Sequence, residues 1–184
     1  DVSAYSQLLW YSHSSGMSTA FAMTGAQLLI EEVVLVGGSS LLSLEWIGNA
    51  SGNSVQLDYS HFQLYMSECQ LYGSSFLAGA LWRDGWSGEN ANVDCASMVW
   101  TMQYCTLNDS SSVWKYNWDG IASGSHAHIN VQRHQVTSMD VFYPFSSVGF
   151  QATWSKPDSG HHAVVLSQYS QWRIMLSFNG VGST

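Results

Sequence analysis

The chain has 184 residues, of which 46% are hydrophobic and 10% are charged, and its formal net charge at pH 7 is −8. This length and apolar content suit one soluble domain over residues 1–184 with a substantial core, and they argue against a disordered chain. The negative charge excludes the basic surface of nucleic-acid-binding proteins and gives no support for attraction to anionic lipids.

No segment is suited to cross a membrane as a helix. The longest apolar stretch, at residues 28–36, is interrupted by Glu31 and Glu32 and is too short to span a bilayer. No signal-peptide pattern opens the sequence, so we expect Asp1 to be the N-terminus of a mature secreted protein.

The cysteines leave the redox state open. Cys69, Cys95 and Cys105 are too few for a disulfide framework in a chain of this length. One pair could form in an oxidising compartment and leave one thiol, and three free buried thiols are an equal alternative.

Residues 1–36 are predicted to form an N-terminal arm followed by a helix. Residues 1–23 are polar and aromatic, which is typical of a mobile arm or a short helix. A helix is predicted over residues 25–36, because Thr24 and Gln27 have the spacing of a capping box. Apolar residues then recur at helical spacing before a Gly-Gly stop, at Ala26, Leu29, Ile30, Val33 and Val36.

After Gly38 the pattern changes to the alternation of strands. Apolar residues alternate with polar ones at Leu42, Leu44 and Trp46, and turn-forming residues separate the later segments. Further strands are predicted near residues 55–65, 75–82, 93–104, 126–132, 148–154, 162–168 and 172–178. A second short helix is predicted at 136–143, before Pro144. No internal repeat is identified, and the sum of these elements indicates an antiparallel β-sandwich flanked by two short α-helices.

The segment 113–120 carries three large aromatic residues at alternate positions. In an extended strand Trp114, Tyr116 and Trp118 would share one face. Trp and Tyr suit membrane interfaces and sugar-binding surfaces, where one end of the ring is apolar and the other is hydrated. The alternative is that this face is turned toward the core.

The histidines and acids give no clear catalytic site. His126 and His128 would share a strand face near His134, in a pattern similar to the first cupin motif, but Gln132 replaces the expected acid and no second motif follows. We expect neither a metal nor a cofactor, and we interpret His161-His162 as a loop pair. No nucleophile elbow, phosphate loop or zinc signature occurs, so the protein is not expected to be an enzyme.

Four stretches together resemble the actinoporins, the pore-forming cytolysins of sea anemones. These stretches are 26–37, similar to the end of the family's first helix, 49–52, similar to a turn after the first strand, Tyr116-Asn117-Trp118, similar to the aromatic membrane loop, and Phe142-Tyr143, similar to the tyrosine pair that ends the second helix. The resemblance implies a β-sandwich with two helices, the same architecture that the pattern indicates.

The resemblance also implies a secreted toxin that binds membranes, recognises phosphocholine lipids such as sphingomyelin and forms oligomeric pores. Residues 1–30 would enter the membrane, and Trp114, Tyr116 and Trp118 would insert at the lipid interface. A phosphocholine pocket would be lined by Val93, Ser111, Val113, Phe142 and Tyr143. Two other functions fit the residues: a carbohydrate-binding β-sandwich lectin, for which exposed Trp and Tyr are equally apt, and a β-sandwich hydrolase, which would need converging carboxylates or histidines.

Overall fold

A computed structural model describes residues 8–13, 18–133, 135–139, 148–167 and 174–178. Throughout these residues the regular structure is β-strand, and no helix occurs among them. The described part of the chain accordingly holds no helix that is long and apolar enough to cross a membrane.

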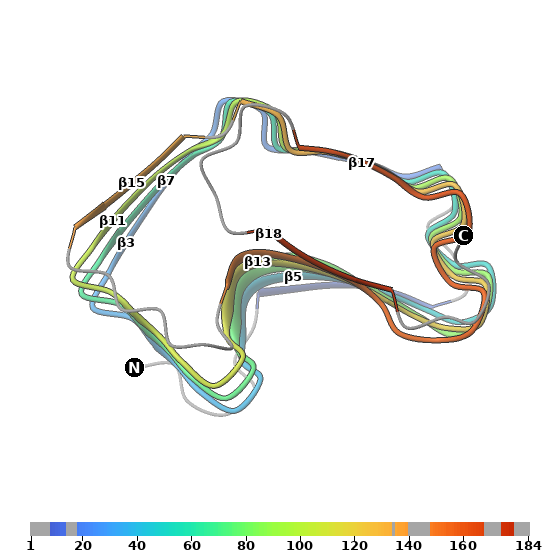
Figure 1. Cartoon of the computed structure of the whole chain (residues 1–184), viewed down its shortest axis with the longest axis horizontal. Coiled ribbons are helices and arrows are strands. Elements are labelled where there is room, and N and C mark those ends of the chain that lie inside the picture. The colour runs from blue at the N-terminus through green and yellow to red at the C-terminus, as the bar shows by residue number, and fades with distance from the viewer. Residues whose placement is uncertain (1–7, 14–17, 134, 140–147, 168–173, 179–184) are drawn as a thin grey trace.

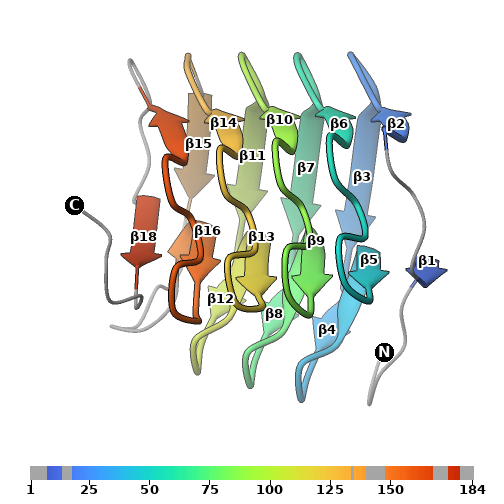
Figure 2. The ribbon, with the colours of Figure 1, turned by 90° about the vertical axis from the view of Figure 1, so that its right-hand side faces the viewer.

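The chain winds into a parallel β-solenoid, and from Ala20 to Leu166 its coils repeat every 36 residues. Gln27 of one coil pairs with Gln63 of the next, which pairs in turn with Val99. Every strand pairing in the described residues is parallel. The coils therefore lie side by side along one axis, as Figure 2 shows.

Four parallel sheets form the sides of the coil (Figure 1). The largest sheet contains β1 (Leu8–His13), β5 (Ser40–Ile47), β9 (Phe76–Arg83), β13 (Ser112–Asp119), β16 (Val148–Trp154) and β18 (Ile174–Phe178). A second sheet contains β2 (Ala20–Ala22), β6 (Gln56–Asp58), β10 (Asn92–Asp94), β14 (His128–Asn130) and β17 (Val164–Leu166). A third contains β3 (Gln27–Glu31), β7 (Gln63–Ser67), β11 (Val99–Gln103) and β15 (Gln135–Met139), and the smallest contains β4 (Val34–Leu35), β8 (Gln70–Leu71) and β12 (Thr106–Leu107).

The predicted antiparallel β-sandwich is wrong, although most of the predicted strand regions do contain strands. Alternation of apolar and polar residues shows that a strand has one buried face, but it does not show the direction of its neighbour. Here each strand pairs with its equivalent one coil away, and the other three sides of the coil provide the crossover that a parallel pair needs.

Both predicted helices are also wrong where the structure describes them. Residues 27–31 and 34–35 of the first form β3 and β4, and residues 136–139 of the second lie in β15, while 140–143 lie outside the described residues. In β3 burial alternates, with Ile30 buried and Leu29 65% exposed. Thr24 does not cap a helix, because its Oγ1 donates a hydrogen bond to Asp58 Oδ2 of the next coil at 2.7 Å.

A stack of four tryptophans fills the interior behind the largest sheet. Trp46, Trp82, Trp118 and Trp154 come from successive coils, and consecutive ring centroids are 5.0, 4.6 and 4.8 Å apart with interplanar angles of 7°, 1° and 3°. We call this row the tryptophan ladder. All four rings are fully buried, so the ladder contributes a large part of the apolar core.

Glycines pack against the faces of the ladder. Gly52, Gly88, Gly124 and Gly160 stand six positions after the ladder tryptophans, and all have positive φ. A Cβ on Gly124 would lie 2.6 Å from Cδ1 of Trp118 and 2.7 Å from Nε1 of Trp154. The backbone conformation therefore favours glycine there, and the lack of space requires it. This pair of Trp and Gly recurs every 36 residues. The sequence therefore does contain an internal repeat, and the prediction that it has none is wrong.

A second row of repeated side chains holds the corner after the second sheet. Asp58 Oδ1 accepts a hydrogen bond from Ser60 N at 2.9 Å, and Asp94 Oδ1 accepts one from Ala96 N at 2.9 Å. Asn130 Oδ1 accepts the equivalent bond from Gln132 N at 3.2 Å. Such turns give the backbone a fixed bend, so they help to set where each coil changes direction.

Candidate functional site

The three aromatic residues predicted to insert into a membrane lie in the core. Trp114, Tyr116 and Trp118 belong to β13 and share one face, as predicted, but this face is fully buried. Trp114 Nε1 donates a hydrogen bond to the Tyr116 hydroxyl at 2.6 Å, and Cys95 Sγ lies 3.3 Å from the same hydroxyl. Burial raises the pKa of Tyr116 well above its ordinary value. The prediction that Tyr116 and Trp118 are exposed is therefore wrong.

The predicted phosphocholine pocket does not open at the surface where the structure describes it. Val93, Ser111 and Val113 are fully buried. Phe142 and Tyr143 lie outside the described residues. The described members of the set are core residues and offer no contact surface for a lipid headgroup.

His126 does not lie beside His128 on one strand face, as predicted, but beside a histidine of the next coil. His126 is exposed in the turn before β14, His128 is half-buried within that strand, and His134 lies outside the described residues. The ring of His126 lies 5.1 Å from that of His162, one coil further on, and the His162 ring lies 3.9 Å from that of His161. Within the described ranges, no three His, Cys, Asp or Glu side chains gather in a way that could hold a metal ion.

The three cysteines are free and buried. Cys69 and Cys105 occupy equivalent positions of neighbouring coils, since Gln70 pairs with Thr106. The hydrogen bond between these two thiols raises the pKa of Cys69 and lowers that of Cys105. Burial raises the pKa of Cys95 to about 12. These thiols are part of the core and do not form a surface site.

An open groove of about 620 Å³ lies at the turns that follow the ladder strands β5, β9, β13 and β16. We call it the corner groove. Its lining combines three exposed apolar side chains with acidic, amide and ammonium groups, from Asn49, Asp84, Gly85, Trp86, Asp119, Gly120, Ile121, Lys156 and Pro157.

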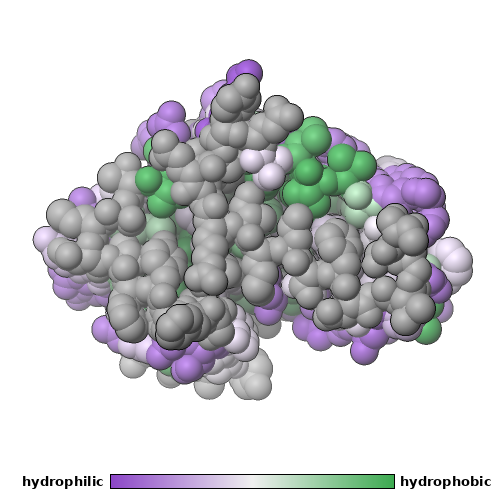
Figure 3. Space-filling view, viewed as in Figure 1, coloured by the Kyte–Doolittle hydropathy of each residue, from purple (hydrophilic) through white to green (hydrophobic). Residues whose placement is uncertain are grey.

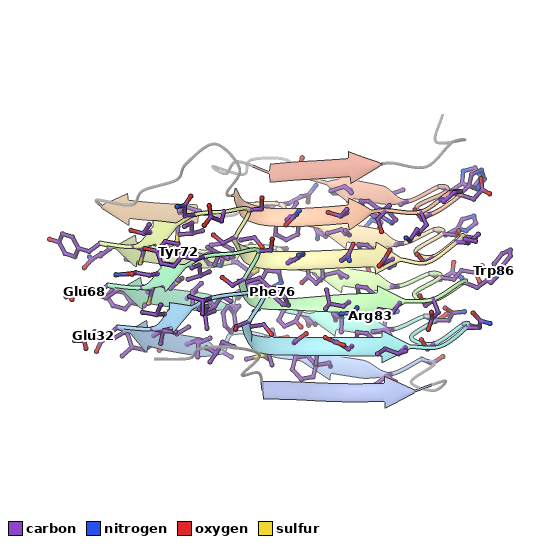
Figure 4. All side chains as sticks on the ribbon, turned by 90° about the horizontal axis from the view of Figure 1, so that it is seen from below. Glu32, Glu68, Tyr72, Phe76, Arg83 and Trp86 are labelled. Carbon is purple, nitrogen blue, oxygen red and sulfur yellow. The ribbon has the colours of Figure 1, made fainter. Side chains whose placement is uncertain are left out.

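Trp86 is the main feature of the corner groove, and its side chain is 59% exposed. Figure 4 shows it projecting from the turn at the edge of the solenoid. Its φ is 61°, and the equivalent residues of the other coils, Ala50, Ala122 and Asp158, have φ values of 57°, 54° and 57°. The other coils form the same turn without an aromatic residue, so the turn itself does not need one. A bulky residue with positive φ is also uncommon in proteins. Together with the exposed Ile121 and the polar groups of the lining, Trp86 makes the corner groove the candidate binding site.

The acidic groups beside Trp86 are held in place. Asp84 Oδ2 accepts a hydrogen bond from Gly48 N of the preceding coil at 2.9 Å. Asp119 Oδ1 accepts one from Ser155 Oγ at 2.7 Å and lies 3.6 Å from Lys156 Nζ. Their bonds fix these carboxylates beside the groove as hydrogen-bond acceptors.

Close backbone packing brings neighbouring turns of the groove together. A Cβ on Gly120 would lie 1.8 Å from the carbonyl oxygen of Asp84. Only glycine allows the two turns to approach this closely. The neighbouring turns are consequently held in contact, and their side chains meet at one surface.

The chemistry of the corner groove suits a neutral, polyhydroxylated ligand. The flat faces of Trp86 and the side chain of Ile121, which is 60% exposed, can cover apolar ligand surface. Carboxylate and amide oxygens accept hydrogen bonds from hydroxyl groups. Two acids and one lysine leave the lining net negative, which opposes binding of an anionic group.

Sequence interpretation missed Trp86 because it missed the repeat. Aligning the coils at their ladder tryptophans places Trp86 where two other coils have alanine, and this departure was the available signal. No protein-family model, curated protein or solved structure matches the chain. Its function is therefore inferred from the corner groove.

Proposed function

We propose that the protein is a secreted, non-catalytic carbohydrate-binding solenoid, and that a sugar ring stacks on Trp86 in the corner groove. The observation that carries the proposal is the exposed indole of Trp86 beside fixed hydrogen-bond acceptors. Small-molecule sites commonly join an apolar surface with a few placed polar groups, and sugars present both kinds of surface.

The same observation favours a sugar over a lipid membrane. A membrane-docking patch needs several exposed aromatic residues without fixed acids between them. Around Trp86 the lining instead includes Asp84 and Asp119, and the aromatic residues named for lipid insertion are in the core. Carboxylates at the docking surface would have to be desolvated, which is costly.

The test is binding of neutral glycans to the wild type and to a pair of matched variants. We expect Trp86→Ala to lower glycan affinity at least roughly tenfold, a loss of about 1.4 kcal/mol of binding free energy. Tyr104→Ala is the matched control, because Tyr104 is 53% exposed and also has positive φ, at 53°, but lies in a different turn. Tyr104→Ala should leave binding unchanged.

Two results would overturn the proposal. One is the absence of binding to every glycan on a broad array, and the other is wild-type affinity in Trp86→Ala. Release of dye from liposomes with and without sphingomyelin tests the pore-forming prediction in parallel. The proposal expects no release, and release that depends on sphingomyelin would favour the cytolysin over the lectin.

A further inference from the structure

The corner groove is built from four successive coils. Asn49 follows β5, Trp86 follows β9, Ile121 follows β13 and Lys156 follows β16. Backbone hydrogen bonds join the turns in sequence, from Ala50 N to the carbonyl oxygen of Gly85 at 3.0 Å and from Trp86 N to that of Ile121 at 3.0 Å. A third bond, from Ala122 N to the carbonyl oxygen of Pro157, measures 3.2 Å.

This stacking sets the length and direction of the groove. Neighbouring parallel strands lie about 4.8 Å apart, so three steps between four coils extend about 14 Å along the solenoid axis. That length exceeds one sugar ring and suits several linked rings. The groove is open to solvent, so a chain could continue past either end.

Each part of this length offers polar groups. The middle coils supply Trp86 and Ile121 together with the carboxylates of Asp84 and Asp119, while the outer coils supply the Asn49 amide at one end and the Lys156 ammonium group beside Pro157 at the other. Asp119 holds Lys156 with an ion pair of 3.6 Å. A ligand matched to this lining has apolar ring faces over its middle and hydroxyl groups along its whole length.

We infer that the corner groove binds an internal segment of a linear, neutral polysaccharide that lies parallel to the solenoid axis. This inference rests on the proposed function and adds the ligand class to it. Rings in the middle of the segment stack on Trp86 and contact Ile121. Hydroxyl groups of the outer rings bind the Asn49 amide at one end and the Lys156 ammonium group at the other.

The experiment compares ligand lengths by isothermal titration calorimetry. The probes are glucose with cello-oligosaccharides up to cellohexaose, and N-acetylglucosamine with chito-oligosaccharides up to chitohexaose. In the series that binds, we expect affinity to rise at least roughly tenfold from the monomer and then to level off once the groove is filled.

Variants at the two ends separate this inference from the proposed function. Asn49→Ala and Lys156→Ala should each weaken binding of the hexamer about three- to tenfold, and each should weaken binding of the hexamer more than binding of the monomer. Trp86→Ala should weaken binding of both. Arg133→Ala, which removes an exposed positive charge from another turn, should change neither. Unchanged melting temperatures would show that the folds are intact.

The outcomes are distinct. Equal affinity for monomer and hexamer, or hexamer binding unaffected by both end variants, would overturn the extended site while leaving a sugar site at Trp86. Failure of every probe in both series to bind the wild type would overturn the extended site for these neutral chains, and the glycan array would then decide the proposed function separately.

Discussion

The tryptophan ladder and the corner groove lie next to each other in four successive coils, yet they differ in how strictly they repeat. In the ladder, Trp46, Trp82, Trp118 and Trp154 are the same residue in four successive coils. Trp86, three positions after Arg83 ends β9, stands at a turn position where two other coils have alanine.

The difference has a physical origin. At the ladder position these four coils offer one another nearly the same space, so tryptophan fits in all four and stacking reinforces the choice. At an exposed turn the backbone conformation still repeats, but the side chain meets solvent and is not constrained by packing. A large side chain at such a position is therefore informative about binding.

The largest expected effect comes from breaking the ladder. Trp118→Ala should lower the free energy of unfolding by about 3–5 kcal/mol, because it removes a fully buried indole between two stacked rings. Trp86→Ala should change the same quantity by less than about 0.5 kcal/mol. Urea unfolding of both variants measures the contrast, and equal losses of stability would refute the assignment of one tryptophan to the core and the other to the surface.

The glycines behind the ladder provide a finer test. Gly124→Ala and Gly25→Ala both place a Cβ on a residue with φ of +65°, which costs about 1–2 kcal/mol in each case. At Gly25 nothing lies within 4 Å, whereas the Cβ at Gly124 would be 2.6 Å from Trp118. Overpacking should therefore make Gly124→Ala less stable than Gly25→Ala by a further 1–3 kcal/mol or so. Thermal unfolding would measure the difference in stability between the two variants. Equal stability would mean that the tryptophan rings move to accommodate the added Cβ without strain.

The smallest expected effect concerns the repeated corner at Asp58. Burial by itself would raise the pKa of this carboxyl, but hydrogen bonds from Ser60 and Thr24 outweigh it and leave the pKa lowered. Because the folded pKa is below the unfolded value, the ionised group stabilises the fold above the unfolded pKa. This contribution is lost as pH falls through the folded pKa.

Asp58→Asn isolates that contribution, because Asn130 makes the equivalent turn in another coil. We expect a loss of stability of about 1 kcal/mol or less at neutral pH. The acid-induced loss of stability below the ordinary carboxyl pKa of 3.8 should also be shallower in the variant. An unchanged slope in pH-dependent urea unfolding would show that Asp58 is not one of the groups responsible.

The sequence predicts much of the local structure and little of its assembly. Alternation correctly placed Trp114, Tyr116 and Trp118 on one face of a strand, but whether that face is buried depends on the neighbouring coils. At residues 25–36 the apolar spacing matched a helix because two short strands and a bend reproduced it by coincidence. The recurring Trp and Gly pairs were visible in the sequence and would have predicted a solenoid.

The corner groove was harder to predict than the fold. Its residues come from four turns that are far apart in the chain, and only the coil period brings them together. Trp86 resembles the other tryptophans until the coils are aligned. Its exposure follows from its place in the turn, which pattern analysis of a single strand does not show.

The most direct measurement is a titration of isotope-labelled tryptophan indole signals in solution with cellohexaose or chitohexaose. The Trp86 signal, assigned with Trp86→Phe, should exchange rapidly with solvent and shift as the sugar binds. The signals of Trp46, Trp82, Trp118 and Trp154 should remain protected and nearly unmoved, because these rings are fully buried. Saturable sugar binding that leaves the Trp86 signal in place would contradict the central claim, as would movement of the ladder signals instead.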